Sequence, residues 1–288
     1  MLKLLLPCLL VLFHCTSVRA QHEVLRSKSS PNAILDSLSQ ELNTIASTDQ
    51  VVGFGVALVN DEGIIFEQAH GYADYASKSP YTVHTVQNIA SISKTFIGIS
   101  LLQAESEGIL SMDDPINKYL PFEVIHPRFP DQPILLKHLA NHTAGISDDK
   151  KYEAAYYLLE PFTTEKGTVQ KWEYKEMRKA SKQSRTELAP FLRSFLLPKG
   201  ALYHRKNFGK TAPGAVYEYS NVGAALAALV LESASSISFR EWTKTRIFQP
   251  LGMKNTGWTL DDITPGTFFT HHFMNGEPMP NYALATYP

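Results

Sequence analysis

Two side chains with complementary chemistry lie three positions apart, Ser91 and Lys94 in the stretch Ala90-Ser91-Ile92-Ser93-Lys94. In a helix, positions i and i+3 share one face with Cβ atoms about 5–6 Å apart, so the hydroxyl and the amine can meet. A serine is a weak nucleophile until a neighbouring base takes its proton, and Lys94 is a candidate base. The positive end of a helix would also favour developing negative charge there. The pair therefore indicates acyl transfer through Ser91, although a lone S-x-x-K is short enough to arise by chance.

A second group of polar residues, Tyr219-Ser220-Asn221, precedes an Ala-rich helix expected from Ala224 to about Ser233. A phenol and an amide two positions apart in a bend can point into one cleft. Tyr219 can pass a proton to a leaving group, and Asn221 can donate to a substrate carbonyl and accept from Lys94. Taken alone, these residues fit a turn tyrosine and a helix cap equally well. Their occurrence in one chain with the Ser91 motif favours the catalytic interpretation.

The Ser91 motif must be held by a helix, and the residues from about Ser93 to Glu107 have the composition of one. This run is apolar nearly all round, and Gly108 follows it as a stop signal. The pattern predicts a buried central helix.

A sheet should precede that helix. A helix is expected to begin at Ser30-Pro31, and two apolar runs follow, Val51 to Val59 and Ile64 to Ala69. The turn residues Asn60-Asp61-Glu62-Gly63 between them predict a β-hairpin. Because two strands alone are marginal in water, further strands must complete this sheet. The turn-rich, polar residues 72–90 lead to Ser91.

Residues 148–210 form a polar interruption. Within it, the run from Lys166 to Arg185 carries seven basic residues, as a nucleic-acid or lipid surface would. Acids are interspersed at Glu173 and Glu176, and the whole chain has a net charge of only −1. We therefore expect a solvated helical insertion and no nucleic-acid partner.

The histidines do not indicate a catalytic or metal site. His142 has no acid at a spacing that would orient it, so it is interpreted as a packing or turn residue. His271 and His272 are adjacent, so their side chains diverge, and H-E-x-x-H and G-x-S-x-G are absent from the sequence. No metal and no other cofactor is expected. Asn141 would be a glycosylation acceptor only in a eukaryotic source.

The amino terminus indicates export. Residues 1–20 contain a short apolar run and read as a signal peptide cleaved after Ala20, which predicts a secreted or periplasmic protein. The apolar run is too short to span a bilayer, so no transmembrane segment is expected. Lipid attachment at Cys15 is disfavoured because the bulky His14 precedes it. Both cysteines, Cys8 and Cys15, lie in this segment, so the mature chain would have no disulfide.

Taken together, the motifs resemble the serine β-lactamase and penicillin-binding-protein superfamily, specifically its class C β-lactamase-like branch. The matching segments are Ile89-Ala90-Ser91-Ile92-Ser93-Lys94, Leu139-Ala140-Asn141-His142-Thr143-Ala144-Gly145-Ile146, Pro213-Gly214 before Tyr219-Ser220-Asn221-Val222-Gly223, and Phe248-Gln249-Pro250-Leu251-Gly252-Met253 before Asn255-Thr256. The resemblance implies an α+β fold with an antiparallel sheet flanked by helices and a helical subdomain beside it. One hydrolase domain, 21–288, would have its sheet part at about 30–90 and its helical part at about 91–265.

The resemblance also implies a role for each candidate residue. Ser91 would be the acylated nucleophile, Lys94 its proton acceptor and Tyr219 the proton shuttle. Asn221 would position the substrate and Lys94. The S-D-N motif of class A is absent, so whether the lysine or the tyrosine is the primary base stays open.

The third motif of the family, Lys-Thr-Gly or His-x-Gly on a strand, is not found. Lys210-Thr211-Ala212 and Asn255-Thr256-Gly257 do not fit it. We therefore expect a C-terminally shortened form, without the strands that would supply a second oxyanion donor and cover the hairpin edge. Two hypotheses follow: an exported serine hydrolase acting through an acyl-enzyme on a β-lactam, a D-alanyl peptide or a small ester, or a non-catalytic relative that binds such a ligand without turnover. The sequence does not indicate an oligomeric state.

Overall fold

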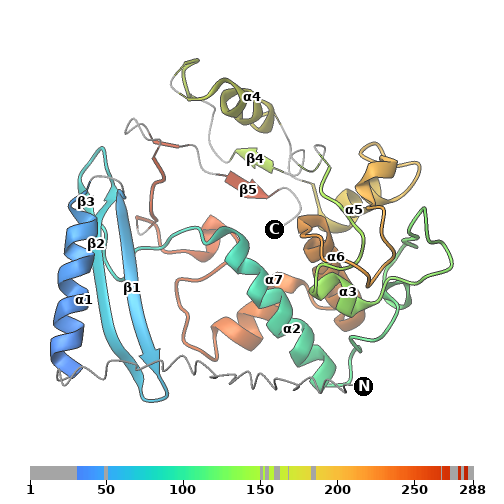
Figure 1. Ribbon diagram of the computed structural model, residues 1–288, viewed down its shortest axis with the longest axis horizontal. Coiled ribbons are helices and arrows are strands. Elements are labelled where there is room, and N and C mark those ends of the chain that lie inside the picture. The colour runs from blue at the N-terminus through green and yellow to red at the C-terminus, as the bar shows by residue number, and fades with distance from the viewer. Residues whose placement is uncertain are drawn as a thin grey trace, which may run out of the picture.

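The computed structural model describes residues 31–48, 51–149, 152, 156–158, 163–167, 169–182, 186–266, 268–272, 278–279 and 282–284. The expected signal peptide and both cysteines lie outside these residues. The described elements form a sheet part at one end of an elongated molecule and a helical part at the other (Figure 1).

The sheet part consists of one helix and a three-stranded antiparallel sheet. Helix α1 spans Pro31–Ala46, and the strands are β1 (Gly53–Asn60), β2 (Gly63–Asp74) and β3 (Ser79–Pro80), in the order β1-β2-β3. The predicted hairpin is confirmed. Its turn is built as the residue types require, because the Asn60 side chain accepts from the backbone N–H groups of Glu62 and Gly63, and Gly63 takes a φ of 126°.

Strand β2 is longer than predicted, because it continues through Gly71 and Tyr72 to pair with β3. The turn-rich stretch expected at residues 72–90 thus also contains the end of β2 and all of β3. Gly71 lies so close to β1 that a Cβ atom there would meet the Val52 carbonyl oxygen at 2.2 Å. This close approach of the two backbones explains why a residue typical of turns sits inside a strand.

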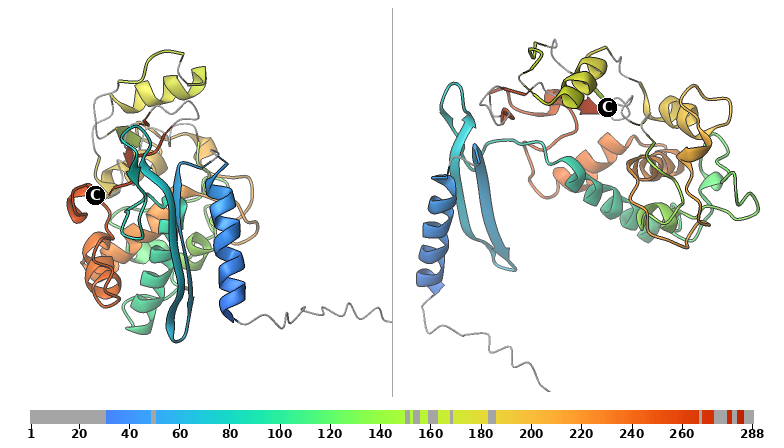
Figure 2. Two further views of the ribbon diagram at one scale, coloured as in Figure 1. Left: turned by 90° about the vertical axis from the view of Figure 1, so that its left-hand side faces the viewer. Right: turned by 45° about the horizontal axis from the view of Figure 1, so that its top comes forward.

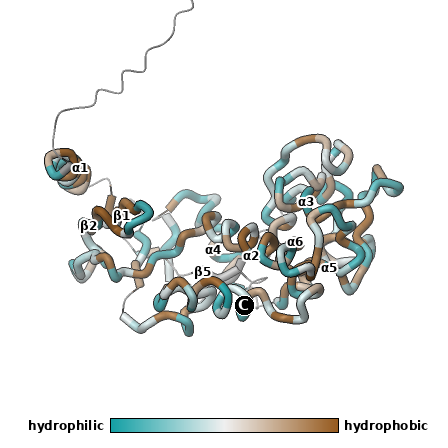
Figure 3. The backbone as a smooth tube through the Cα atoms, turned by 90° about the horizontal axis from the view of Figure 1, so that it is seen from below, coloured by the Kyte–Doolittle hydropathy of each residue, from teal (hydrophilic) through white to brown (hydrophobic). Residues whose placement is uncertain are grey.

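Helix α1 lies alongside the sheet and contacts β2, burying Leu42 (Figure 2). Much of the apolar surface of the hairpin is nevertheless uncovered: Val59 is 69% exposed and Ile64 is 64% exposed. Figure 3 shows hydrophobic stretches of β1 and β2 beside α1, at the end of the molecule away from α3, α5 and α6. In the part of the chain that the structure describes, only the two-residue β3 extends the sheet beyond the hairpin.

The helical part packs around α6. The remaining elements are η1 (Ala90–Ser93), α2 (Lys94–Ser106), η2 (Ile116–Lys118), α3 (Leu136–Ala140), β4 (Tyr156–Leu158), α4 (Lys171–Ala180), α5 (Leu188–Leu196), η4 (Arg205–Asn207), α6 (Asn221–Ser235), α7 (Phe239–Thr243), η5 (Lys244–Phe248), η6 (Leu260–Asp262) and β5 (Tyr282–Leu284). Helix α6 contacts α2, α3, α5 and α7. Its residues Leu226 and Val230 are fully buried in one continuous core with Leu101, Phe195 and Trp242.

The buried central helix is α6 and not α2, which corrects the prediction for residues 93–107. Helix α2 buries Ser100, Leu101 and Ala104, whereas Ile99 is 44% exposed and Leu102 is 61% exposed. Both helices are largely apolar, but the main contacts of α6 are with four helices, whereas those of α2 are with α6, α7 and η1. The alanines of α6 add little side-chain volume, which lets its neighbours approach closely.

The polar insertion contains the expected helix, α4, which buries only Met177 and Ala180. It also contains β4, a strand that the sequence did not predict, which pairs antiparallel with the distant β5. In Figure 1 this two-stranded sheet lies below α4.

The extended residues 268–272 connect the two parts of the molecule. The Phe269 N–H donates to the Val86 carbonyl at 2.6 Å, and the Thr270 N–H donates to the Ala73 carbonyl at 2.9 Å.

Among the described helices, none alone has the length and apolar character to cross a membrane. Helix α6 passes that test only together with residues 239–248, across a bend of 83°.

Candidate active site

The nucleophile candidate lies where a 3₁₀ turn becomes an α-helix. Element η1 runs directly into α2, so Ser91 is in the tight turn and Lys94 is the first residue of the α-helix. In a 3₁₀ helix the side chains at i and i+3 eclipse one another. The Lys94 Nζ atom accordingly donates to Ser91 Oγ at 3.0 Å. The contact expected from the S-x-x-K spacing is present.

The residue before the nucleophile has a strained backbone. Ala90 has a φ of 46°, a left-handed conformation that costs a residue with a Cβ atom about 1–2 kcal/mol. The Asn88 side chain accepts from the Ala90 N–H at 2.8 Å and holds it there. This sharp turn presents Ser91 at the surface. Nothing in the sequence motif indicated it, because alanine is not a residue type that favours positive φ.

Tyr219 reaches the same hydroxyl from the other side. Its Oη atom lies 2.8 Å from Ser91 Oγ, and Lys94 Nζ lies 5.2 Å from the centroid of its ring. Tyr219 is 42% exposed, so a solvent-borne molecule can reach the cluster. The structure therefore brings together the serine, the lysine and the tyrosine that the sequence placed in two separate motifs.

Asn221 is the first residue of α6 and not part of a bend before it, so the helix begins three residues earlier than predicted. Its Oδ1 atom accepts from Tyr219 Oη at 3.2 Å. Its Nδ2 atom donates to the carboxylate of Asp148 at 2.7 Å. The expected hydrogen bond from Lys94 to this amide is not found among the described residues. The second N–H of Nδ2 can donate to a substrate carbonyl.

One arrangement of protons satisfies both contacts of the Tyr219 hydroxyl. In the contact with the Asn221 oxygen the phenol must be the donor, whereas either hydroxyl can donate in the contact with Ser91. Because the phenol has one proton, it then donates to Asn221 and accepts from Ser91. Lys94 in turn donates to Ser91. The Ser91 proton therefore points at the phenol oxygen in this state.

His142 packs against the cluster. Its ring centroid lies 4.7 Å from that of Tyr219, and its Nδ1 atom accepts from the Ser220 N–H at 3.2 Å. Burial, and after it the positive charge of Lys94, lower the pKa of His142 below its usual value. The ring is thus a neutral wall of the site, which agrees with its interpretation as a packing residue and places it beside Tyr219.

Asp148 was not recognised in the sequence as part of this group. Its Oδ1 atom accepts from Ser220 Oγ at 2.9 Å and from the Val222 N–H at 3.0 Å, and its Oδ2 atom accepts from the N–H and the side-chain amide of Asn221, both at 2.7 Å. The first turn of any helix leaves N–H groups that need acceptors. That rule predicts that α6 needs such a partner, but it does not say which of the chain's carboxylates supplies it.

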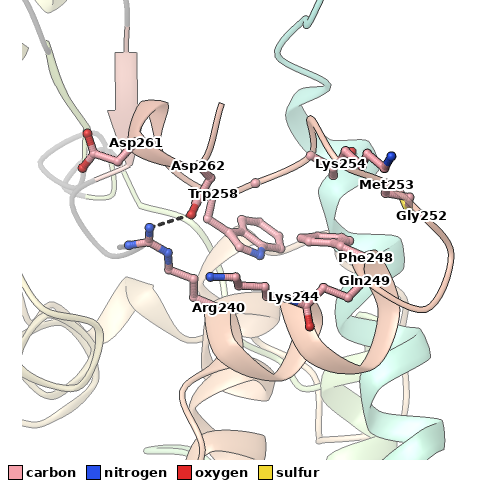
Figure 4. A pocket seen from close by; sticks show the side chains of 12 residues that line it. Arg240, Lys244, Phe248, Gln249, Gly252, Met253, Lys254, Trp258, Asp261 and Asp262 are labelled. Atoms are coloured by element: carbon pink, nitrogen blue, oxygen red, sulfur yellow. Dashed lines mark hydrogen bonds and ion pairs between the residues drawn. The ribbon is translucent and has the colours of Figure 1, made fainter. Parts of the chain in front are cut away.

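A separate cavity of about 470 Å³ lies among α7, η5 and the residues that follow them (Figure 4). Its lining includes Arg240, Lys244, Phe248 and Trp258, and Arg240 pairs with Asp262 at 2.7 Å. None of its described lining residues belongs to the Ser91 cluster. This cavity is therefore not the place where that cluster would act.

Comparison with known proteins agrees with the geometry. The profile of the family described as Beta-lactamase matches residues 35–272. Penicillin-binding protein 4* of Bacillus subtilis (strain 168) is 28% identical over 203 residues, which cover 70% of this chain and 37% of that protein. The chain thus spans well under two thirds of the length of this relative.

Two solved structures share the fold. The octameric penicillin-binding protein homologue from Pyrococcus abyssi aligns with a TM-score of 0.59 at 19% identity, covering 89% of this chain and 51% of that one. EstCE1, a hydrolase with promiscuous acyltransferase activity, aligns with a TM-score of 0.58 at 23% identity, covering 86% and 60%. The expected α+β fold, with a small antiparallel sheet and helices, is confirmed. The chain belongs to the β-lactamase family, whose members are serine hydrolases.

Proposed function

We propose that this protein hydrolyses an amide or an ester of a small molecule or peptide through an acyl-enzyme on Ser91. The observation that carries the proposal is the position of the Ser91 hydroxyl, 3.0 Å from the Lys94 amine and 2.8 Å from the Tyr219 phenol. Nucleophile and base within hydrogen-bond reach are what covalent acyl transfer requires.

In the acylation step, Ser91 Oγ attacks the substrate carbonyl carbon while its proton moves to the Lys94 amine in its neutral form, or to Tyr219 after the phenol has passed its own proton to the Lys94 amine. The tetrahedral intermediate then collapses, the C–N or C–O bond breaks, and the leaving group takes up that proton. Both candidate bases contact Oγ, so the geometry is compatible with either. The Asn221 amide donates to a carbonyl of the substrate.

In the deacylation step, water attacks the acyl carbon and gives its proton to the same base. The bond between the acyl carbon and Ser91 Oγ breaks, and the serine regains a proton. Tyr219 is 42% exposed, so water can reach the site. No step uses a metal or another cofactor.

The names of similar proteins support this substrate class, since they include penicillin-binding proteins and a hydrolase with acyltransferase activity. The signal-peptide pattern of residues 1–20 supports secretion or export to a periplasm. We therefore propose that the hydrolase is a secreted or periplasmic protein.

The test is covalent labelling of the full chain with a fluorescent penicillin and with a fluorophosphonate, followed by mass spectrometry of the peptide that contains Ser91. We expect an adduct on Ser91 that disappears in Ser91→Ala, and slow release of the acyl group. Ser93→Ala is the matched control, because it removes a neighbouring hydroxyl and keeps the cluster. A penicillin that raises the melting temperature without any adduct would instead support the alternative, a binding protein without turnover.

A further inference from the structure

Asp148 connects the loop after α3 to the start of α6, and its hydrogen-bond partners are Ser220, Asn221 and Val222. Its carboxylate is the acceptor in four hydrogen bonds of 2.7–3.0 Å. A carboxylate has about four acceptor positions, so this group is fully used. It is 72–74 residues away from its partners in the chain.

The most consequential of these bonds is the one to the Asn221 side chain. A carboxylate can only accept, so the edge of the amide that faces Asp148 must be its NH₂ group. The other edge, the Oδ1 atom, must then face Tyr219. The short bond to Asp148 thus decides which end of the amide meets the phenol.

The orientation of that amide determines the orientation of the Tyr219 proton. With Oδ1 beside it, the phenol donates to Asn221 and accepts from Ser91. If the amide turned over, the phenol would accept from Asn221 and donate to Ser91, which would occupy a lone pair that Ser91 needs for attack. Asp148 prevents this reversed arrangement.

We propose that Asp148 is a positioning residue for the Ser91 reaction, which acts by holding the Asn221 amide with its oxygen toward Tyr219. The proposal rests on the hydrolase function proposed above. It differs from a purely structural role, in which Asp148 would only cap α6.

The test compares rates of Ser91 labelling in a double-mutant cycle of the full chain. Asp148→Asn keeps the size of the side chain and replaces one acceptor oxygen with a donor. We expect labelling to slow about tenfold to a hundredfold, the effect of a misplaced reacting group, with the loss in kcat and little change in KM. In an Asn221→Ala background, Asp148→Asn should then change the labelling rate less than about threefold, since the two residues act through one contact.

Ser220→Ala is the matched control. It removes another of the four donors to Asp148 and the hydroxyl that accepts from the Gly223 N–H, but it leaves the Asn221 amide in place. It should lower the melting temperature and leave labelling within about threefold of the unmodified chain. Equal slowing by Ser220→Ala and Asp148→Asn, or additive effects in the cycle, would overturn the proposal.

A second measurement does not depend on activity. In NMR spectra of the isotope-labelled full chain, we expect the Asn221 side-chain NH₂ protons to exchange slowly with solvent and to lose this protection in Asp148→Asn. Fast exchange in the unmodified chain would overturn the positioning role. If Ser91 is never labelled but the protection is found, the proposed hydrolase function fails while the orientation of Asn221 by Asp148 stands.

Discussion

The proposed chemistry depends on one hydroxyl, that of Ser91, with two neighbours of different kinds. Lys94 is fixed by its place in the helix, three residues after Ser91, and it contacts Oγ through local geometry alone. Tyr219 is 128 positions away and reaches Oγ only if the tertiary fold is correct. The lysine contact was therefore predictable from spacing, whereas the tyrosine contact was predictable only from the joint occurrence of two motifs.

Removal of the phenol oxygen tests the proposed role of Tyr219 as a proton shuttle. Tyr219→Phe keeps the ring against His142 and deletes the hydroxyl that contacts Ser91. General acid–base catalysis is typically worth about 10²–10⁴-fold, so we expect the rate of Ser91 acylation to fall by that order. Tyr217→Phe is the control, because Tyr217 is 66% exposed and packs on the same histidine from 5.9 Å. A rate unchanged in Tyr219→Phe would remove the tyrosine from the mechanism.

The left-handed turn at Ala90 predicts that Ala90→Gly raises the stability of the fold and lowers the rate of acylation. Ala90→Gly relieves a conformation that costs alanine about 1–2 kcal/mol, but glycine also gains freedom in the unfolded chain, so we expect a net stabilisation of up to about 1 kcal/mol. The added local freedom should slow acylation, because Ser91 follows directly. Ser236 has a similar φ of 58° at the end of α6, so Ser236→Gly should stabilise without slowing acylation. Urea unfolding and labelling rates measure both; faster acylation in Ala90→Gly would contradict the argument.

At the scale of elements, composition identified the helices and the hairpin but not their burial. Helix α1, the hairpin turn and the helices carrying Ser91 and Asn221 follow from apolar spacing and turn residues. Helices α2 and α6 both have apolar residues on most of their surface, so periodicity did not say which one is central, although α6 has the more apolar composition. The pairing of β4 with β5 joins segments more than a hundred residues apart, and three-residue strands leave no alternating pattern to detect.

Two adjacent leucines in α2 test the correction made for that helix. Leu101 is fully buried and Leu102 is 61% exposed. Leu101→Ala should lower the free energy of unfolding by about 2–5 kcal/mol through lost burial and a cavity, whereas Leu102→Ala should change it by about 0.5 kcal/mol or less. Chemical denaturation of both variants measures the difference. Comparable losses would mean that the face of α2 carrying Leu102 is covered in solution.

At the scale of the whole molecule, the candidate active-site cluster belongs to the helical part, whereas the described sheet part leaves large apolar side chains exposed. Ser91, Lys94, Asp148, Tyr219 and Asn221 come from three segments that all pack on the core around α6. The marginal stability of two strands in water predicted that further strands complete the sheet. Among the described residues only the two-residue β3 extends it, and Val59 and Ile64 stay exposed. The hairpin sequence could predict that more strands are needed but not which segments supply them, because a strand pattern does not specify its partners.

The histidines give the whole molecule a pH-dependent stability. His126, His138, His142 and His271 each have a pKa lowered below the usual value, with burial as the main cause. Because the folded-state pKa of each lies below that of the unfolded chain, the unfolded state binds more protons at pH values below about 6.5, and stability falls as the pH decreases through that window. The carboxylates whose pKa is lowered, Asp74, Asp114 and Asp262, start from a value of 3.8 and add their own loss only at lower pH. The urea concentration at the midpoint of unfolding should therefore drop between pH 7 and pH 5. His126→Gln removes a buried titrating ring, so the drop should be smaller in this variant. A midpoint independent of pH in that range would show that these rings accept protons without unfolding.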